Sequence, residues 1–253
     1  MNDPRREKIR LAEMTYEEAQ ALVTTGCWAL LPTGATEAHG PHLPLDTDVI
    51  IADTAAERAV RLLEAEGVHA VVLPPVAYSV TDYAGDFAGT LSLPIETSQA
   101  FVRDVILAAV RSCFRGVVVC NAHLEPGNIT ALRGAVDEAR AAGVLAAFPD
   151  VTQKPHALRL GDEFRSGACH AGSYETSLVL AARPFGVKED VALTLPENAK
   201  SLSTAIREGK KTFLEAGGPR AYFGAPAEGS AAEGDALYVE LADIFASAVR
   251  DLM

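Results

Sequence analysis

Two short groups of polar residues in this sequence carry the side chains that bind divalent metal ions. Glu37 and His39, followed by Asp48, form the first group, and His123 and Glu125 form the second. Three carboxylates and two imidazoles are about the ligand set of two ions that share one bridging carboxylate and leave room for a water molecule. The sequence therefore predicts a metal-dependent hydrolase with these five residues as metal ligands.

Each group directly follows an apolar run that is typical of a buried strand. The first run is 27–32 (CWALLP) and the second is 117–120 (VVVC). In extended backbone, residues i and i+2 point to the same side, so the two polar side chains of one motif should face the same way. Open parallel sheets bind ligands at the carboxyl ends of their strands. We therefore expect the two groups to converge at that edge of a sheet.

A third group, His170 and Glu175, lies at the start of an expected late helix. Metal-assisted amide hydrolysis needs an imidazole or carboxylate that protonates the leaving nitrogen, and these two residues are the candidates. Helix capping is the alternative, with Ser173 as the N-cap and Glu175 in the first turn, where an acid suits the helix dipole.

Other titratable residues are interpreted as structural or surface groups, because an isolated histidine or acid near a strand end is most often solvated or caps a helix. His69 and His156 are placed in this class. Three acids are placed there too: Asp46, Asp53 and Glu57. Asp46 is nevertheless close enough to Asp48 in sequence to compete with it as a metal ligand.

The composition limits the class of protein. The 253 residues, without a long linker or repeat, favour one domain over 1–253, and 49% hydrophobic residues indicate an ordinary soluble core. A net charge of −12 argues against partners such as nucleic acid or anionic membranes. The apolar runs are too short to span a membrane, the first ten residues are too charged for a secretion signal, and the four cysteines lack a CxxC spacing. We expect a cytoplasmic protein with reduced thiols.

Strand and helix patterns alternate along the chain, which predicts a parallel sheet with helices on both faces. Strands are expected at 27–32, 70–74, 116–121 and 143–148, and helices at 48–66, 95–114, 127–142, about 173–182 and about 235–252. In the helix 95–114, we expect Phe101, Val105, Ala108 and Ala109 to form the buried stripe. Residues 184–233 have weak periodicity and should be rich in loops, serving as a subunit contact or a lid.

Four segments together resemble the creatininase-like amidohydrolases, and they occur in that family's order. They are 31–44 (LPTGATEAHGPHLP) followed by Asp48, then Gly89-Thr90, 121–125 (NAHLE) and 170–177 (HAGSYETS). The resemblance implies a three-layer α/β/α fold, a binuclear metal centre and hydrolysis of a C–N bond other than a peptide bond, in a small amide. It also implies an assembly of several identical subunits, often a hexamer.

The resemblance also implies a role for each ligand. Glu37 and His123 would hold one metal ion, His39 and Glu125 the second, and Asp48 would bridge them. Mixed imidazole and carboxylate sites suit Zn, Mn and Fe, with Zn as our first expectation.

For proton transfer, the resemblance implies that His170 carries a proton to the leaving nitrogen and that Glu175 orients His170 or relays the proton. The sequence leaves open whether Glu175 is catalytic, a metal ligand or a helix-capping residue.

Two departures from the family pattern make creatinine a poor substrate candidate. Aromatic residues expected inside the His-x-Glu motif and before the His-Ala-Gly motif are replaced by Leu124 and by 165–168 (RSGA), and the single tryptophan, Trp28, belongs to a strand core. We expect a pocket with less aromatic character and a small cyclic or formylated amide as substrate, with a formamide deformylase as the nearest case. A peptide-end hydrolase, a ring-opening hydrolase and a non-catalytic metal-binding accessory protein remain alternatives.

Overall fold

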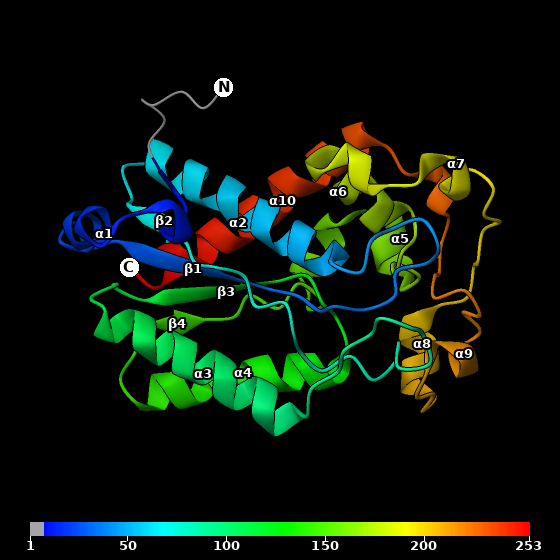
Figure 1. Cartoon of the computed structure of the whole chain (residues 1–253), viewed down its shortest axis with the longest axis horizontal. Coiled ribbons are helices and arrows are strands. Elements are labelled where there is room, and N and C mark those ends of the chain that lie inside the picture. Colours follow the sequence, from blue (N-terminus) through cyan, green and yellow to red (C-terminus); the bar gives the residue numbers. More distant parts are fainter. Residues whose placement is uncertain (1–7) are drawn as a thin grey trace.

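A parallel sheet lies at the centre of the molecule (Figure 1). The structure is a computed structural model and describes residues 8–253, so most of the charged start on which the expectation about secretion rests lies outside the described residues. The strands are β1 (Trp28–Thr33), β2 (Ala70–Val72), β3 (Val117–Asn121) and β4 (Ala146–Ala147). They pair in the order β2-β1-β3-β4, and every pair is parallel, which confirms the predicted sheet.

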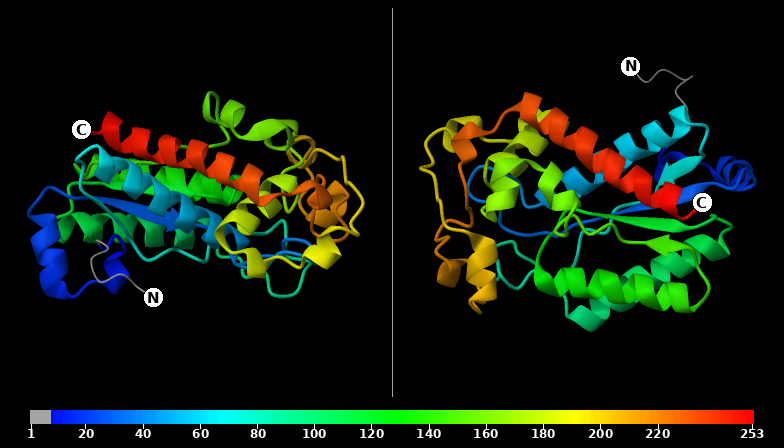
Figure 2. Two further views of the ribbon diagram at one scale, coloured as in Figure 1. Left: turned by 90° about the horizontal axis from the view of Figure 1, so that it is seen from above. Right: turned by 180° about the vertical axis from the view of Figure 1, so that it is seen from behind.

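Helices cover both faces of the sheet, as Figures 1 and 2 show. Helices α2, α6 and α10 pack on one face, and α3 and α4 pack on the other. The helices are α1 (Tyr16–Val23), α2 (Thr47–Ala65), α3 (Ile95–Arg111), α4 (Pro126–Ala141), α5 (Gly161–Ser166), α6 (Ser173–Ala182), α7 (Glu189–Ala192), α8 (Leu202–Arg207), α9 (Phe213–Ala216) and α10 (Ala231–Asp251). The three-layer α/β/α prediction is therefore confirmed.

The sheet is apolar because it is covered on both sides. All six residues of β1 are buried, and alternate side chains enter different cores: Trp28 and Leu30 face α2, α6 and α10, whereas Ala29 and Leu31 face α3 and α4. The four cysteines are unpaired, in agreement with the expectation of reduced thiols. Within residues 8–253, no helix combines the length and the apolar character that crossing a membrane requires.

The buried face of α3 matches the predicted stripe in part. Ala109 is buried and Val105 is partly buried against the same core, as predicted. Phe101 is 51% exposed and Ala108 is also exposed, whereas Val102 and Ile106 are buried against the sheet. Both sets of positions have helical spacing, so the pattern alone permits two rotations of the helix. Packing against α4 and β3 selects the rotation that buries Val102 and Ile106.

The strand order creates a crevice between β1 and β3. From β1 the chain passes through α2 to β2 on one side, whereas from β3 it passes through α4 to β4 on the other side. The connections that follow these neighbouring strands therefore leave in opposite directions, and such switch points are where open α/β sheets bind ligands. The first two groups of candidate ligands follow β1 and β3 directly.

Replacing a leucine of the central strand tests how much of the stability this two-sided core provides. Leu30→Ala should lower the free energy of unfolding by about 2–5 kcal/mol, because Leu30 is fully buried and the substitution leaves a cavity. Leu145→Ala is the matched control, with a side chain that is 43% exposed, and should cost less than about 1 kcal/mol. Denaturant unfolding of the metal-free proteins measures both values, and equal losses would contradict the assignment of the core.

Candidate metal centre

The segment after β1 brings Glu37 and His39 into the crevice. The Glu37 N–H donates to the Leu45 carbonyl (3.1 Å), and the Ala38 N–H donates to the Thr90 hydroxyl oxygen (3.2 Å). This second bond gives the Gly89-Thr90 motif a structural role. Gly34 permits the close approach of α2, because a Cβ there would lie 2.7 Å from Asp48 Cβ.

Asp48 lies between the two candidate histidine ligands. It comes from the first turn of α2 and is 1% exposed. Its Oδ1 is 3.2 Å from His39 Nε2, and its Oδ2 is 3.1 Å from His123 Nδ1. A carboxylate with one oxygen toward each imidazole has the arrangement expected of a bridging ligand.

Backbone carbonyls fix which nitrogen of each ring faces the carboxylates. His39 Nδ1 donates to the Glu37 carbonyl (3.2 Å), and His123 Nε2 donates to the Val80 carbonyl (2.8 Å). The opposite nitrogens, His39 Nε2 and His123 Nδ1, point at carboxylate oxygens. Metal-binding histidines are oriented in this way by a hydrogen bond from their other nitrogen. His39 Nε2 is buried within 3.6 Å of three carboxylates, where a metal ion could take the place of its proton.

Ligand atoms within 4.8 Å of one another define three candidate groups among the described residues. The groups are Glu37, Asp48 and His123; His39, Asp48 and Glu175; and Glu37, His39 and His170. The first two share Asp48, so the residues present fit two ions joined by one carboxylate. The assignment of these side chains as ligands stays a prediction.

Glu125 lies at the cavity but belongs to none of these groups among residues 8–253. Its two carboxylate oxygens accept hydrogen bonds from the Asp82 N–H (3.0 Å) and the Tyr83 N–H (3.2 Å). Burial raises the pKa of the Glu125 carboxyl to about 7, against the opposing effect of His123. Its ligand role stays a prediction, and the geometry places it beside the cluster, held by two backbone N–H groups.

Glu175 occupies the place in the second group that the resemblance assigned to Glu125. Its Oε2 accepts from the Ala171 N–H (2.6 Å) and lies 3.5 Å from His39 Nε2. The N-cap of α6 is Gly172, without a side-chain hydrogen bond, so the alternative with Ser173 as N-cap is wrong. Of the three roles that the sequence leaves open for Glu175, the geometry fits that of a metal ligand.

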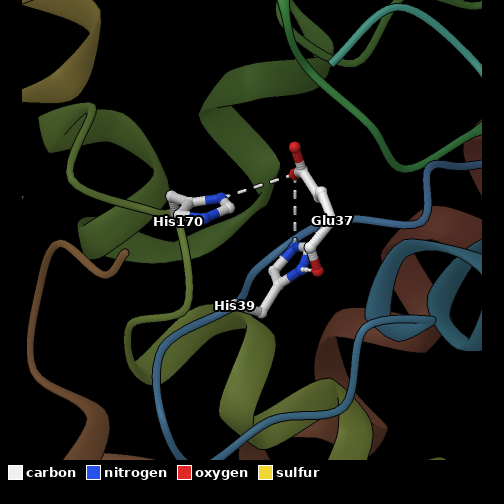
Figure 3. Close-up of side chains that lie close together, drawn as sticks. All are labelled: Glu37, His39 and His170. Carbon is white, nitrogen blue, oxygen red and sulfur yellow. Dashed lines mark hydrogen bonds and ion pairs between the residues drawn. The ribbon is translucent and has the colours of Figure 1, made fainter. Parts of the chain in front are cut away.

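His170 is held between two rings beside the candidate groups. Its ring centroid lies 4.5 Å from that of His39 and 4.2 Å from that of Phe213. Its Nε2 donates to the Ala38 carbonyl (3.0 Å), and its Nδ1 faces Glu37 Oε1 at 3.8 Å (Figure 3). Burial, followed by the charge on His39, lowers the pKa of His170 to about 4, so the ring is neutral at pH 7.

Glu163 is a structural partner of the site that sequence reasoning missed. Its carboxylate accepts from three backbone N–H groups, those of Ser173 (3.0 Å), Tyr174 (2.9 Å) and Ala225 (2.8 Å). It thereby joins the start of α6, which carries Glu175, to the segment before α10. No motif marks this residue, because the contact depends on how distant segments fold together.

A cavity of about 340 Å³ opens onto the candidate ligands. Leu124 lines it, as does part of the 165–168 segment. Leu124 and the 165–168 segment contribute no aromatic ring, but three rings from other segments line the cavity: Tyr83, Phe164 and Phe213. Phe213 belongs to the 184–233 region, which contributes part of the cavity wall. This region contains three short α-helices, two 3-10 helices and the start of α10.

The other residues that we interpreted as structural lie away from the candidate groups. His69 is exposed, and Asp46 forms an exposed ion pair with Arg183 at 2.7 Å, so it does not compete with Asp48. Asp53 and Glu57 both pair with Arg10.

Comparison with known proteins gives one family over nearly the whole chain. Residues 12–249 match the family described as "Creatininase: Creatinine amidohydrolase". The mycofactocin precursor peptide peptidase of Mycobacterium ulcerans is 33% identical over 239 residues, covering 92% of this chain and 88% of the relative. The creatinine amidohydrolase of Pseudomonas putida is 29% identical over 211 residues, covering 75% and 78%. A solved structure described as "Creatininase Mn" has a TM-score of 0.72 at 23% identity, covering 97% and 98% of the two chains.

Exchanging one carboxylate for an amide tests the shared ligand. Asp48→Asn should lose stoichiometric zinc and the rise in Tm that zinc gives to the native protein, because both candidate groups share this carboxylate. Asp46→Asn, two residues earlier and 47% exposed, is the matched control and should keep both. Elemental analysis and thermal unfolding with and without zinc measure the effect. Zinc bound equally by both variants would contradict the shared-ligand assignment.

Metal binding should release protons. Burial disfavours the charged form of His39, but Asp48, Glu175 and Glu37 outweigh it and raise its pKa to about 10. Burial raises the pKa of Glu175 to about 8. Both groups therefore hold protons at pH 7 that an ion must displace, so zinc affinity should rise with pH, by about tenfold per pH unit for each proton displaced. Calorimetric titration between about pH 6 and about pH 8 measures the slope, and an affinity independent of pH would contradict this charge state.

Proposed function

The chain belongs to the creatininase family, and from that membership we propose that it is a metal-dependent amidohydrolase with a binuclear centre. The observation that carries the proposal is the buried cluster of Glu37, Asp48 and Glu175 around His39 Nε2, which lies within 3.6 Å of all three carboxylates. Such a cluster would be costly to bury without positive charge between its members.

The donor set supports two ions that share one ligand. Glu37, Asp48 and His123 would hold the first, and His39, Asp48 and Glu175 would hold the second. Zinc is the leading candidate, and manganese is named in the description of the similar solved structure. When bound, such ions polarise a carbonyl oxygen and lower the pKa of a bound water to near neutrality.

Residues of the chain would transfer the proton to the leaving nitrogen. His170 is neutral at pH 7, and its Nε2 is engaged by the Ala38 carbonyl, which leaves Nδ1 as the atom that accepts a proton and passes it to the leaving nitrogen. Phe213 stacks on this ring and shields it from water. Glu125, with its pKa near neutrality, is a second group that holds or gives up a proton at the cavity wall.

The cavity volume supports a small substrate or a short part of a larger one. About 340 Å³ is near the lower end of the range for small-molecule sites. A small cyclic or formylated amide is the first candidate. Cleavage at a peptide end is the second, and it is favoured by the relative that is named as a precursor peptide peptidase.

An assay with a matched pair of histidine variants tests the proposal. His170→Asn should lower turnover by about 100-fold or more, the usual effect of losing an acid–base group, while the zinc content stays unchanged. His69→Asn, at an exposed histidine, should leave turnover unchanged. The substrates are creatinine, formamidopyrimidines, hydantoins and short peptides, each with zinc or manganese restored.

Two results would contradict this account. Loss of zinc from His170→Asn would make His170 a ligand, and a metal-loaded native protein that hydrolyses none of these amides would favour a non-catalytic metal-binding protein.

A further inference from the structure

Two arginines line the same cavity as the candidate metal ligands. Arg207 ends α8 and is exposed to solvent. Its guanidinium donates to Thr204 Oγ1 (3.0 Å), and within residues 8–253 it has no carboxylate partner. A guanidinium that lines a cavity and has no carboxylate partner can bind an anion that enters the cavity.

The second arginine, Arg165, has one carboxylate partner among the described residues and also donates to the Leu158 carbonyl (3.3 Å). Arg165, with a side chain 47% exposed, pairs with Asp162, whose side chain is 90% exposed. Pairs between exposed groups contribute little, because water screens both charges. An entering anion can therefore replace Asp162 at little cost.

The charges of the cavity are separated along its depth. Its carboxylates are Glu37, Asp48, Glu125 and Glu175, all 9% exposed or less, so they form the deep end. The exposed Arg165 and Arg207 form the outer end. The chain has a net charge of −12, so the positive charge of two arginines at one cavity is opposite in sign to the charge of the protein as a whole.

We propose that Arg207, assisted by Arg165, binds a carboxylate of the substrate, so that the enzyme acts on amides that carry a free carboxylate. This inference rests on the proposed amidohydrolase function and names its substrate class. The substrate's amide lies at the acidic end with the ions, and its carboxylate lies at the basic end. Two sources provide this chemistry: the carboxyl terminus of a peptide, and a small amide that is itself a carboxylic acid.

Substrate pairs that differ only in the carboxylate test the proposal. The probes are N-formylglycine with N-formylglycinamide, and alanylphenylalanine with its carboxyl-terminal amide. For each pair, kcat/KM is measured with the zinc-loaded protein where turnover occurs, and calorimetric titration gives Kd where it does not. The native protein should prefer the carboxylate member of at least one pair by roughly tenfold or more, the effect of one charge-assisted interaction.

Variants then locate the group responsible. Arg207→Gln should remove most of that preference with little change for the amidated member, and Arg165→Gln should reduce it less. Lys210→Gln is the matched control, because Lys210 is exposed and close in sequence but does not line the cavity. It should keep the preference, and zinc content confirms that each variant is folded.

The outcomes separate the two sources and the two proposals. Preference confined to alanylphenylalanine identifies a peptide terminus, and preference confined to N-formylglycine identifies a small acid. Equal values within both pairs would overturn the inference. A preference that persists in Arg207→Gln would also overturn it, because the carboxylate would then bind elsewhere, such as on the ions. Failure of the proposed function is a separate result, the hydrolysis of no amide at all.

Discussion

The structure depends on the burial of three carboxylates beside one another at the end of the sheet. Glu37, Asp48 and Glu175 are each less than 5% exposed, and all three approach His39 within 3.6 Å. Negative charges in such a site are costly unless positive charge lies among them. In the metal-free protein, burial disfavours the charged forms of His39 and His123, but Glu37 and Asp48 outweigh it and raise the pKa values of both, so both rings hold protons. Burial also raises the pKa of Glu175 to about 8, so this carboxyl is protonated at pH 7. Divalent ions would satisfy the same requirement with more charge and with fixed geometry.

The surrounding fold keeps these groups in place. Backbone carbonyls of Glu37, Val80 and Ala38 orient the three imidazoles, so that no histidine of the site depends on a mobile partner. The sheet supplies the rigid base, because β1 and β3 lie next to each other at the switch point. Glu163 extends this order to α6 by binding two of its first backbone N–H groups together with Ala225. Backbone groups of several segments therefore hold the charged side chains of the site in position.

Local sequence was sufficient to predict the sheet and the convergence of the two motifs at its edge. Apolar runs followed by Glu37-x-His39 and His123-x-Glu125 carry their signal within a few residues, and the structure brings both motifs together. Spacing alone does not indicate which of Glu125 and Glu175 lies beside His39 and Asp48, because both acids belong to motifs and their distances to His39 depend on tertiary contacts. The sequence also did not indicate that Tyr83, Phe164, Phe213 and Arg207 line the cavity, for a related reason. They come from segments without periodicity, whose positions depend on packing against the rest of the chain.

The central claim is that two ions share Asp48 in this crevice. Anomalous diffraction from crystals of the zinc-loaded protein tests it most directly, because it locates each ion independently of activity. The account predicts two peaks on either side of Asp48, one contacted by Glu37 and His123 and the other by His39 and Glu175. No peak in the crevice, or a single peak without contact to Asp48, would contradict it.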